Sequence, residues 1–259
     1  RLNRDLWLRA LAAAAAGIAL CAALAAPPAA MCARPLEREG NPMSKELNIP
    51  ACGEPGIVTR DTQLYSPDTC ARELAQLNRR YPGVTALALV GTSHLGQPIY
   101  ALKMGNDGAG RRVLVQAAMH GREWINAQLV MAQIEDYLSG EEYAPLLDEA
   151  CFLLVPMCNP DGVRIAQEGA GWIEDEEARA LVEDLIARSG QAHDQWKANG
   201  RGVDLNRNFD ARFAEQTDPR ETAGPAYAFY RGERAESEPE TQALVQLTLE
   251  FQPTVTLSY

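Results

Sequence analysis

Met119-His120-Gly121-Arg122-Glu123-Trp124 joins an apolar run to an amphipathic segment, and the rest of the chain is organised around this junction. The run at residues 113–118 predicts a buried strand. Residues 124–138 predict a helix, because their apolar side chains recur at spacings of three and four. His120 therefore leaves the end of a strand, while Glu123 enters the first turn of a helix. Side chains at such a junction converge above the edge of an open α/β sheet, where these sheets bind ligands.

An imidazole and a carboxylate that converge on one point are two of the three protein ligands of a catalytic zinc site. The pattern HxxE fixes only two positions, however. A structural hydrogen bond between His120 and Glu123 is a simpler explanation of that pattern when it stands alone. Further motifs have to decide between the two interpretations.

The composition is that of a folded, acidic protein. Its 259 residues suit one sizeable domain, alone or with appendages, and a hydrophobic content of 46% is ordinary for a globular core. The formal net charge of -11 argues against nucleic-acid and anionic-membrane partners, and solubility alone explains it.

The N-terminal residues have the features of an export signal. Arg1, Arg4 and Arg9 precede an apolar run at residues 11–25, and Ala23-Leu24-Ala25 offers a cleavage site. An uncleaved anchor is the alternative, but the run is short and alanine-rich for a membrane span. We therefore expect a signal peptide at 1–25 and a secreted or extracytoplasmic protein, in the periplasm, the cell wall or the extracellular space. After cleavage we expect no stable membrane partner.

Residues 26–60 are rich in Pro, Gly and Ala and show no sustained period. They predict a linker or N-terminal arm, which leaves residues 61–259 as the folded domain. Six cysteines are present, and an exported chain could pair Cys52 with Cys70, or Cys151 with Cys158. Spacing alone does not decide between these pairings.

Strands and helices alternate along the domain. The expected elements are a helix opened by Ser66-Pro67-Asp68 and running to Arg80, strands at 85–90 and 99–104 that form a hairpin, a strand at 151–156, a helix at 174–188, a helix from a capping box at 237–240 to about Phe251, and a strand at 254–259. This alternation predicts an α/β fold with a mixed, mostly parallel central sheet flanked by helices.

Three further motifs follow the HxxE pattern. They are NPDG at 159–162, GVDLNRNF at 202–209 with WKAN before it at 196–199, and SEPET at 237–241. NPDG on its own predicts an ordinary tight turn. In this order the motifs resemble the zinc metallocarboxypeptidase family, the carboxypeptidase A-like enzymes, from about Leu64 to the chain end. The sequence is more similar to bacterial secreted members, some of which cleave peptidoglycan stem peptides. The resemblance implies a carboxypeptidase-like (zinc exopeptidase) fold that is C-terminally incomplete here.

The resemblance also assigns roles to individual residues. It implies that His120 and Glu123 are ligands of Zn²⁺ and that Arg122 contacts substrate near the metal. Asn206 and Arg207 match the pair that binds the free C-terminal carboxylate of the substrate. A planar, two-pronged guanidinium suits that task, although a surface salt bridge is the alternative for Arg207.

Lys197 departs from the family pattern. Many members place an arginine at this position to stabilise the tetrahedral oxyanion. Lysine supplies the positive charge but not the paired N–H donors of a guanidinium. Arg201 is a rival for the role. His94 and His193 are expected to be surface residues, because neither falls where the family has its third zinc ligand.

The family's third zinc ligand is a histidine just after a strand of the kind at 254–259, so we expect it just after Tyr259. The general-base glutamate and a substrate-capping tyrosine lie further on in the family. We therefore expect a sequence that is truncated at both ends, contains no general base and is inactive as given.

These expectations describe a monomeric, zinc-dependent metallocarboxypeptidase that hydrolyses C-terminal peptide bonds with zinc-activated water. One alternative with the same chemistry is an endopeptidase that cleaves peptidoglycan stem peptides at diaminopimelate. Another is a non-catalytic module that binds peptides without the metal. For the enzymes, the expected partner is a peptide or muropeptide substrate.

Overall fold

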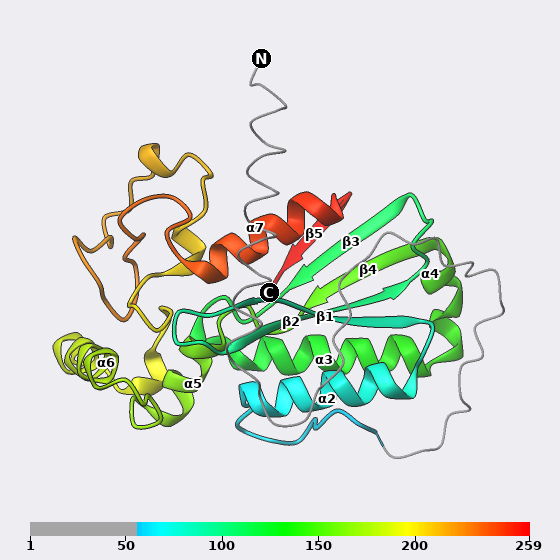
Figure 1. Cartoon of the computed structure of the whole chain (residues 1–259), viewed down its shortest axis with the longest axis horizontal. Helices are drawn as coiled ribbons and strands as arrows, with labels where there is room; N and C mark the ends of the chain where they lie inside the picture. Colours follow the sequence, from blue (N-terminus) through cyan, green and yellow to red (C-terminus); the bar gives the residue numbers. More distant parts are fainter. Residues whose placement is uncertain (1–55) are drawn as a thin grey trace, which may run out of the picture. The chain divides into compact units, whose positions relative to one another are not determined.

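The computed structural model describes residues 56–259, which contain a five-stranded sheet (Figure 1). Its strands are β1 (Thr85–Thr92), β2 (Pro98–Gly105), β3 (Arg111–Gln116), β4 (Ala150–Val155) and β5 (Val255–Ser258), in the order β1-β2-β4-β3-β5. β3 runs parallel to β4 and β5, whereas β1 with β2 and β2 with β4 are antiparallel. The predicted α/β fold with a mixed sheet is confirmed. Parallel pairs make up half of the described sheet rather than most of it.

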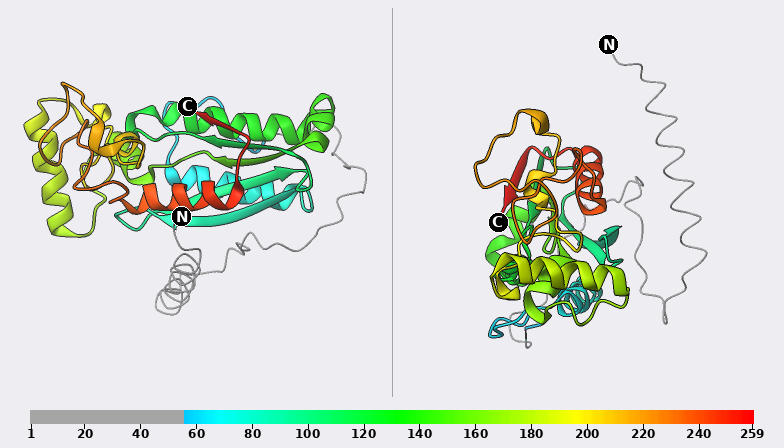
Figure 2. Two further views of the ribbon diagram at one scale, coloured as in Figure 1. Left: turned by 90° about the horizontal axis from the view of Figure 1, so that it is seen from above. Right: turned by 90° about the vertical axis from the view of Figure 1, so that its left-hand side faces the viewer.

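Helices cover both faces of the sheet (Figures 1 and 2). Helices α2 (Pro67–Arg80) and α3 (Trp124–Ser139) share one apolar core with it, and α7 (Pro239–Phe251) shares another. Successive side chains of a strand point to opposite faces. Leu154 of β4 therefore enters the core with α2 and α3, while Leu153 enters the core with α7. All of β4 is buried, as expected for a strand that is covered on both sides.

Two helices were not predicted. They are α4 (Ala144–Glu149) and α5 (Pro160–Glu168), and the second begins where NPDG was expected to form only a tight turn. Asn159 caps α5, since its Oδ1 accepts the N–H of Gly162 at 2.8 Å. Pro160 takes the first helical position, where a missing N–H is tolerated. The motif is therefore a helix start, and it brings α5 into a third apolar cluster with α6 (Glu176–Ser189) and Trp196.

Local capping signals were right at one helix and wrong at another. Ser66 caps α2, and its Oγ accepts the N–H of Thr69 at 3.2 Å. The predicted capping box at 237–240 does not form, because α7 begins at Pro239 and has no side-chain cap. The Ser237 hydroxyl instead donates to Glu238 Oε1 at 2.7 Å and accepts from Asn208 Nδ2 at 2.9 Å. The neighbouring Glu238 and the distant Asn208 have thus taken the hydroxyl that the local cap would have used.

Short 3-10 turns complete the described secondary structure, at Gly121–Glu123, Glu141–Tyr143, His193–Gln195, Leu205–Arg207 and Phe213–Glu215. Cys70, Cys151 and Cys158 are buried free thiols, so the pairing of Cys151 with Cys158 is wrong. The extended strand β4 separates these two residues by well over the roughly 7 Å that a disulfide tolerates between Cα atoms. Cys52 lies outside the described residues.

The predicted signal peptide at 1–25 and most of the predicted arm at 26–60 also lie outside the described residues. The last residues of the arm, 56–60, pack against the domain. Val58 is buried in the core with α2 and α3, and its N–H donates to Glu135 Oε1 at 3.1 Å. Within residues 56–259, no helix has both the length and the apolarity to cross a membrane.

Candidate metal and carboxylate site

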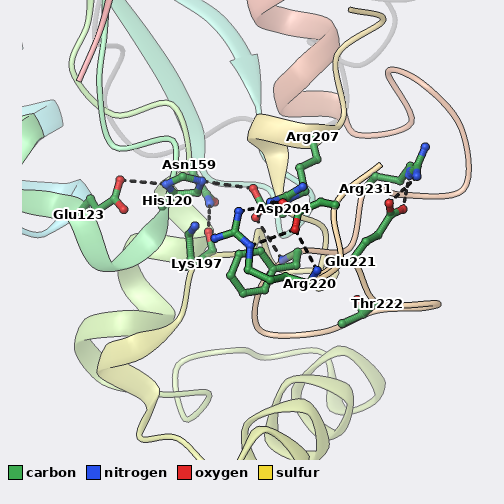
Figure 3. A network of polar contacts seen from close by, with 12 residues as sticks. His120, Glu123, Asn159, Lys197, Asp204, Arg207, Arg220, Glu221, Thr222 and Arg231 are labelled. Atoms are coloured by element: carbon green, nitrogen blue, oxygen red, sulfur yellow. Dashed lines mark hydrogen bonds and ion pairs between the residues drawn. The ribbon is translucent and has the colours of Figure 1, made fainter. Parts of the chain in front are cut away.

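His120 and Glu123 converge at the end of β3, as the sequence predicts. The backbone of His120 is extended, and the 3-10 turn that follows it places Glu123 directly before α3. His120 Nδ1 lies 2.9 Å from Glu123 Oε2. The sharp turn from strand to helix therefore brings an imidazole nitrogen and a carboxylate oxygen to one point (Figure 3).

Asn159 forms hydrogen bonds that connect the strand-to-helix junction at His120 with the segment that carries Lys197. The side chain is fully buried, and its Nδ2 donates to the carbonyl oxygens of Met119 at 3.1 Å and of Ala198 at 3.0 Å. The N–H of Gly121 also donates to the carbonyl of Lys197 at 3.1 Å. NPDG thus does more than start a helix, because its first residue joins two segments that carry candidate site residues.

Asp204 is a site residue that the sequence analysis did not single out. Its carboxylate is 1% exposed, and Oδ1 lies 3.2 Å from His120 Nε2, the ring nitrogen that faces away from Glu123. The N–H of Phe229 donates to the other oxygen, Oδ2, at 3.1 Å. GVDLNRNF contains Asp204, but only the tertiary structure shows that it contacts His120.

The three side chains change one another's ionisation. Burial lowers the pKa of His120, but its contacts with Asp204 and Glu123 outweigh burial and raise that pKa above its ordinary value. The hydrogen bond with His120 holds the pKa of Glu123 below its usual range. Burial raises the pKa of Asp204, and its contact with His120 more than reverses this. Both carboxylates are therefore ionised at neutral pH, as metal binding and ligand support require.

Arg207 lies on the other side of Asp204. Its Nε is 3.5 Å from Asp204 Oδ2, and its Nη2 donates to Asp218 Oδ2 at 2.6 Å. Asn206 beside it is exposed. The salt bridge considered as the alternative for Arg207 therefore exists, but it lies within the site, where only Asp204 separates it from His120.

The other predicted residues divide between the site and the surface. Lys197 is half-buried, and its charge interacts with Asp204 and Glu123. Its rival Arg201 instead pairs with Glu233 and Glu238 at 3.7 and 3.8 Å. Lys197, and not Arg201, therefore lies beside the His120–Glu123 pair, and Arg122 Nε lies 4.0 Å from Glu123 Oε1.

Three further sequence-predicted residues are exposed. Arg122 is exposed, and its Nη1 donates to Gln195 Oε1 at 3.4 Å. His94 and His193 are also exposed, as predicted for surface residues. None of these three contacts His120 in the described structure.

Most of the described chain matches a family of known proteins. The zinc carboxypeptidase family matches residues 70–259, and the chain belongs to this family of peptide hydrolases. The gamma-D-glutamyl-L-diamino acid endopeptidase 1 of Lysinibacillus sphaericus is 33% identical over 197 residues, which cover 72% of this chain and 48% of that protein. Mast cell carboxypeptidase A of Mus musculus is 28% identical over 170 residues, which cover 64% and 36%.

A solved structure supports the fold. The crystal structure of thrombin activatable fibrinolysis inhibitor superposes with a TM-score of 0.59 at 21% identity, over 76% of this chain and 47% of that one. The chain spans about half the length of the first curated relatives that it matches.

The family implies a zinc ion, and the residues present fit two of its ligands. Zinc takes imidazole nitrogen and carboxylate oxygen, the groups that converge at His120 Nδ1 and Glu123. Metal-binding histidines commonly direct their other nitrogen at a carboxylate, and Asp204 meets His120 Nε2 in this way. Asp204 Oδ1 is buried and has no hydrogen bond of ideal geometry in the described structure, and His120 Nε2 is the polar group that faces it. Within residues 56–259, no cluster of three or more His, Cys, Asp or Glu side chains is arranged to hold a metal.

Asp204→Asn is expected to weaken zinc binding by about 10–100-fold, the usual effect of removing a carboxylate that supports a metal-binding histidine. It should also lower the pKa of His120, because the anion that stabilises the charged ring is lost. Calorimetric zinc titration measures the first effect, and NMR titration of the metal-free chain measures the second. Asp210→Asn, an exposed change in the same loop, is the control. Unchanged zinc affinity in Asp204→Asn would show that this carboxylate only holds the fold.

Proposed function

We propose that this chain carries the metal-binding and carboxylate-binding residues of a zinc-dependent metallocarboxypeptidase. One observation carries the proposal: the buried carboxylate of Asp204 contacts both His120, at 3.2 Å, and Arg207, at 3.5 Å. His120, one of the two proposed metal ligands, lies at Oδ1 of Asp204, and Arg207, the cation suited to a substrate carboxylate, lies at Oδ2. A peptide bond next to a free carboxylate fits that arrangement.

In this proposal His120 and Glu123 hold the metal, with Asp204 orienting the imidazole. A bound zinc ion would supply Lewis acidity and an activated water. Arg207 binds and orients the terminal carboxylate of the substrate, with Asn206 beside it. Lys197 supplies positive charge next to the metal pair, where negative charge develops during hydrolysis. Arg122 contacts the substrate from the exposed side. Export through residues 1–25 and a monomeric state belong to the same proposal.

A second candidate is an endopeptidase that cleaves peptidoglycan stem peptides at a diamino acid. The relative from Lysinibacillus sphaericus is named as a gamma-D-glutamyl-L-diamino acid endopeptidase, and its identity of 33% exceeds the 28% of the mast cell carboxypeptidase. The observation in favour of this candidate is that three cations, Lys197, Arg207 and Arg220, surround one aromatic ring beside Asp204. Two of these cations, Arg207 and Arg220, already share the carboxylate of Asp218, so a substrate with more than one carboxylate suits this cluster.

The test compares free-acid and amidated substrates with the full-length gene product. Arg207→Ala is expected to reduce kcat/KM on free-acid peptides by about 10–100-fold, the loss of one charge-assisted hydrogen bond. Amidated peptides should already be poor substrates and lose little more. A hippuryl amino acid and a stem peptide ending in diaminopimelate, assayed side by side, distinguish the two candidates.

His120→Ala completes this test. It should abolish both zinc binding and hydrolysis, whereas His193→Ala, at an exposed histidine, should change neither. Equal losses on free-acid and amidated peptides would show that Arg207 supports the fold and does not bind substrate. Peptide binding that persists without zinc, and without any hydrolysis, would indicate a non-catalytic binding module.

A further inference from the structure

The ring of Phe229 lies among three cations. The Nζ of Lys197 is 5.0 Å from the ring centroid, and the guanidinium carbons of Arg207 and Arg220 are 5.2 and 4.8 Å from it. The face of an aromatic ring carries partial negative charge, so it holds cations at these distances. Figure 3 shows Lys197, Arg207 and Arg220 gathered beside Asp204. Asp204 and Asp218 lie among these cations and offset part of their charge.

The backbone of Phe229 is in a conformation that bulky residues rarely adopt. Its φ is +70°, in the left-handed region. This conformation accompanies the hydrogen bond from its N–H to Asp204 Oδ2, at 3.1 Å. Strained residues of this kind persist where the surrounding structure holds them, and they concentrate at functional sites. The ring is thus anchored to the same carboxylate that contacts His120.

Asp218 shows what kind of group the two arginines bind. Arg220 binds it in a bidentate way, with Nε donating to Oδ1 at 3.0 Å and Nη2 donating to Oδ2 at 2.8 Å. Arg207 Nη2 also donates to Oδ2, at 2.6 Å. Each guanidinium has five N–H donors. No described residue accepts from Nη1 of Arg207 or of Arg220. Both side chains therefore keep donors for a further carboxylate.

Arg220 is also accessible. Its side chain is 65% exposed, whereas that of Arg207 is 18% exposed. Because both guanidiniums lie on one ring and share Asp218, a molecule bound to Arg207 comes within reach of Arg220. Arg220 lies outside the motifs of the sequence analysis, and no local signal distinguishes it from other surface arginines.

We infer that Arg220 is a specificity residue that binds a second carboxylate on the substrate, next to the terminal carboxylate held by Arg207. The inference rests on the proposed function, which assigns the terminal carboxylate to Arg207. It names the substrate class: peptides whose C-terminal residue carries a carboxylate in its side chain, as in glutamate or a diamino dicarboxylic acid. Phe229 is the platform that holds the two guanidiniums at one place.

Binding of two matched peptides tests this assignment. The probes are Gly-Gly-Glu and Gly-Gly-Gln, which differ only in the side-chain charge of the last residue. They are titrated into the full-length gene product after removal of zinc with a chelator, so that no peptide is cleaved. We expect the Glu peptide to bind about five- to tenfold more tightly, the effect of one exposed charge-assisted interaction. Arg220→Gln should reduce this ratio to about one.

Two further variants make the outcomes distinct. Arg188→Gln makes the same charge change on the exposed surface of α6 and should leave the ratio as it is. Arg207→Gln should weaken both peptides if the proposed function is right. The role of Arg220 alone is overturned if Arg220→Gln leaves the ratio of the two peptide affinities unchanged. It is also overturned if that ratio is near one in the unaltered protein. If Arg207→Gln also changes neither peptide, the proposed function fails with it.

Discussion

Gly121→Ala is expected to lower the free energy of unfolding by more than about 3 kcal/mol. A Cβ atom at Gly121 would lie 2.1 Å from the carbonyl oxygen of Gly162 and 2.3 Å from its carbonyl carbon. Both are backbone atoms of the first turn of α5, so no side-chain rotation relieves the clash. The strand end that carries His120 would have to move away from α5. Urea denaturation followed by circular dichroism measures the loss.

Gly171→Ala is the matched control, because a Cβ atom there meets no atom within 4 Å. It should change stability by no more than about 0.5 kcal/mol. Zinc titration of Gly121→Ala adds a functional measurement, because the clash lies between the two proposed ligands His120 and Glu123. If Gly121→Ala is as stable as the control, the close contact between the two turns is not a constraint on this site.

Glu240→Gln is expected to flatten the dependence of stability on pH by up to about 3 kcal/mol. The carboxylate of Glu240 is fully buried, where it accepts the N–H of His94 at 3.0 Å and a hydrogen bond from Asn199 Nδ2 at 3.2 Å. Burial raises its pKa from 4.5 to about 7, and the nearby Asp161 adds to the effect. The group therefore resists ionisation in the folded chain.

Glu240 has a higher pKa in the folded chain than in the unfolded chain, so its contribution to stability falls as the pH rises. In the unfolded chain Glu240 releases its proton near its ordinary pKa of 4.5, whereas in the folded chain it keeps the proton up to about pH 7. Its contribution to stability is complete below the first value and is lost as the pH rises through the second. Asp161, whose pKa burial raises from 3.8 to about 6, acts in the same direction. Denaturation at pH 5, 6, 7 and 8 measures the slope.

The comparison between variants isolates Glu240 from the other groups that titrate in this range. Glu250→Gln, at an exposed position on the same helix, should keep the slope of the unaltered protein. The amide that replaces the carboxyl group in Glu240→Gln has only one acceptor oxygen for two donors. This variant is therefore judged by its slope and not by its absolute stability. An unchanged slope would show that Glu240 is ionised in the folded chain at neutral pH.

The sequence predicted the centre of the site because the relevant signals are local. His120 and Glu123 are three residues apart, and the switch from a buried strand to an amphipathic helix places both side chains above the sheet edge. The Ser66 cap, the hairpin and the strand at 151–156 were found in the same way. Each of these features depends on residues within one or two turns of chain.

The capping box at Ser237 failed for the opposite reason. Asn208 is distant in the sequence but lies beside Ser237 in the fold, and its buried amide takes the Ser237 hydroxyl as a partner. NPDG and SEPET, two of the motifs that carry the resemblance, place Asp161 and Glu240 beneath the hairpin turn at 93–97. Their buried bonds explain the residue types better than any local turn does.

The sequence by itself determined the order of the described strands and of most of the helices, the junction that carries His120 and Glu123, and the motifs that identify the family. Only the tertiary structure decided that Asp204 supports His120, that Arg220 joins Arg207 over Phe229, and that Glu240 is buried enough to hold its proton. Periodicity and capping are properties of neighbouring residues, so the sequence displays them. Ion pairs, desolvation and ring contacts depend on which distant segments the sheet and helices bring together, and no local pattern records that.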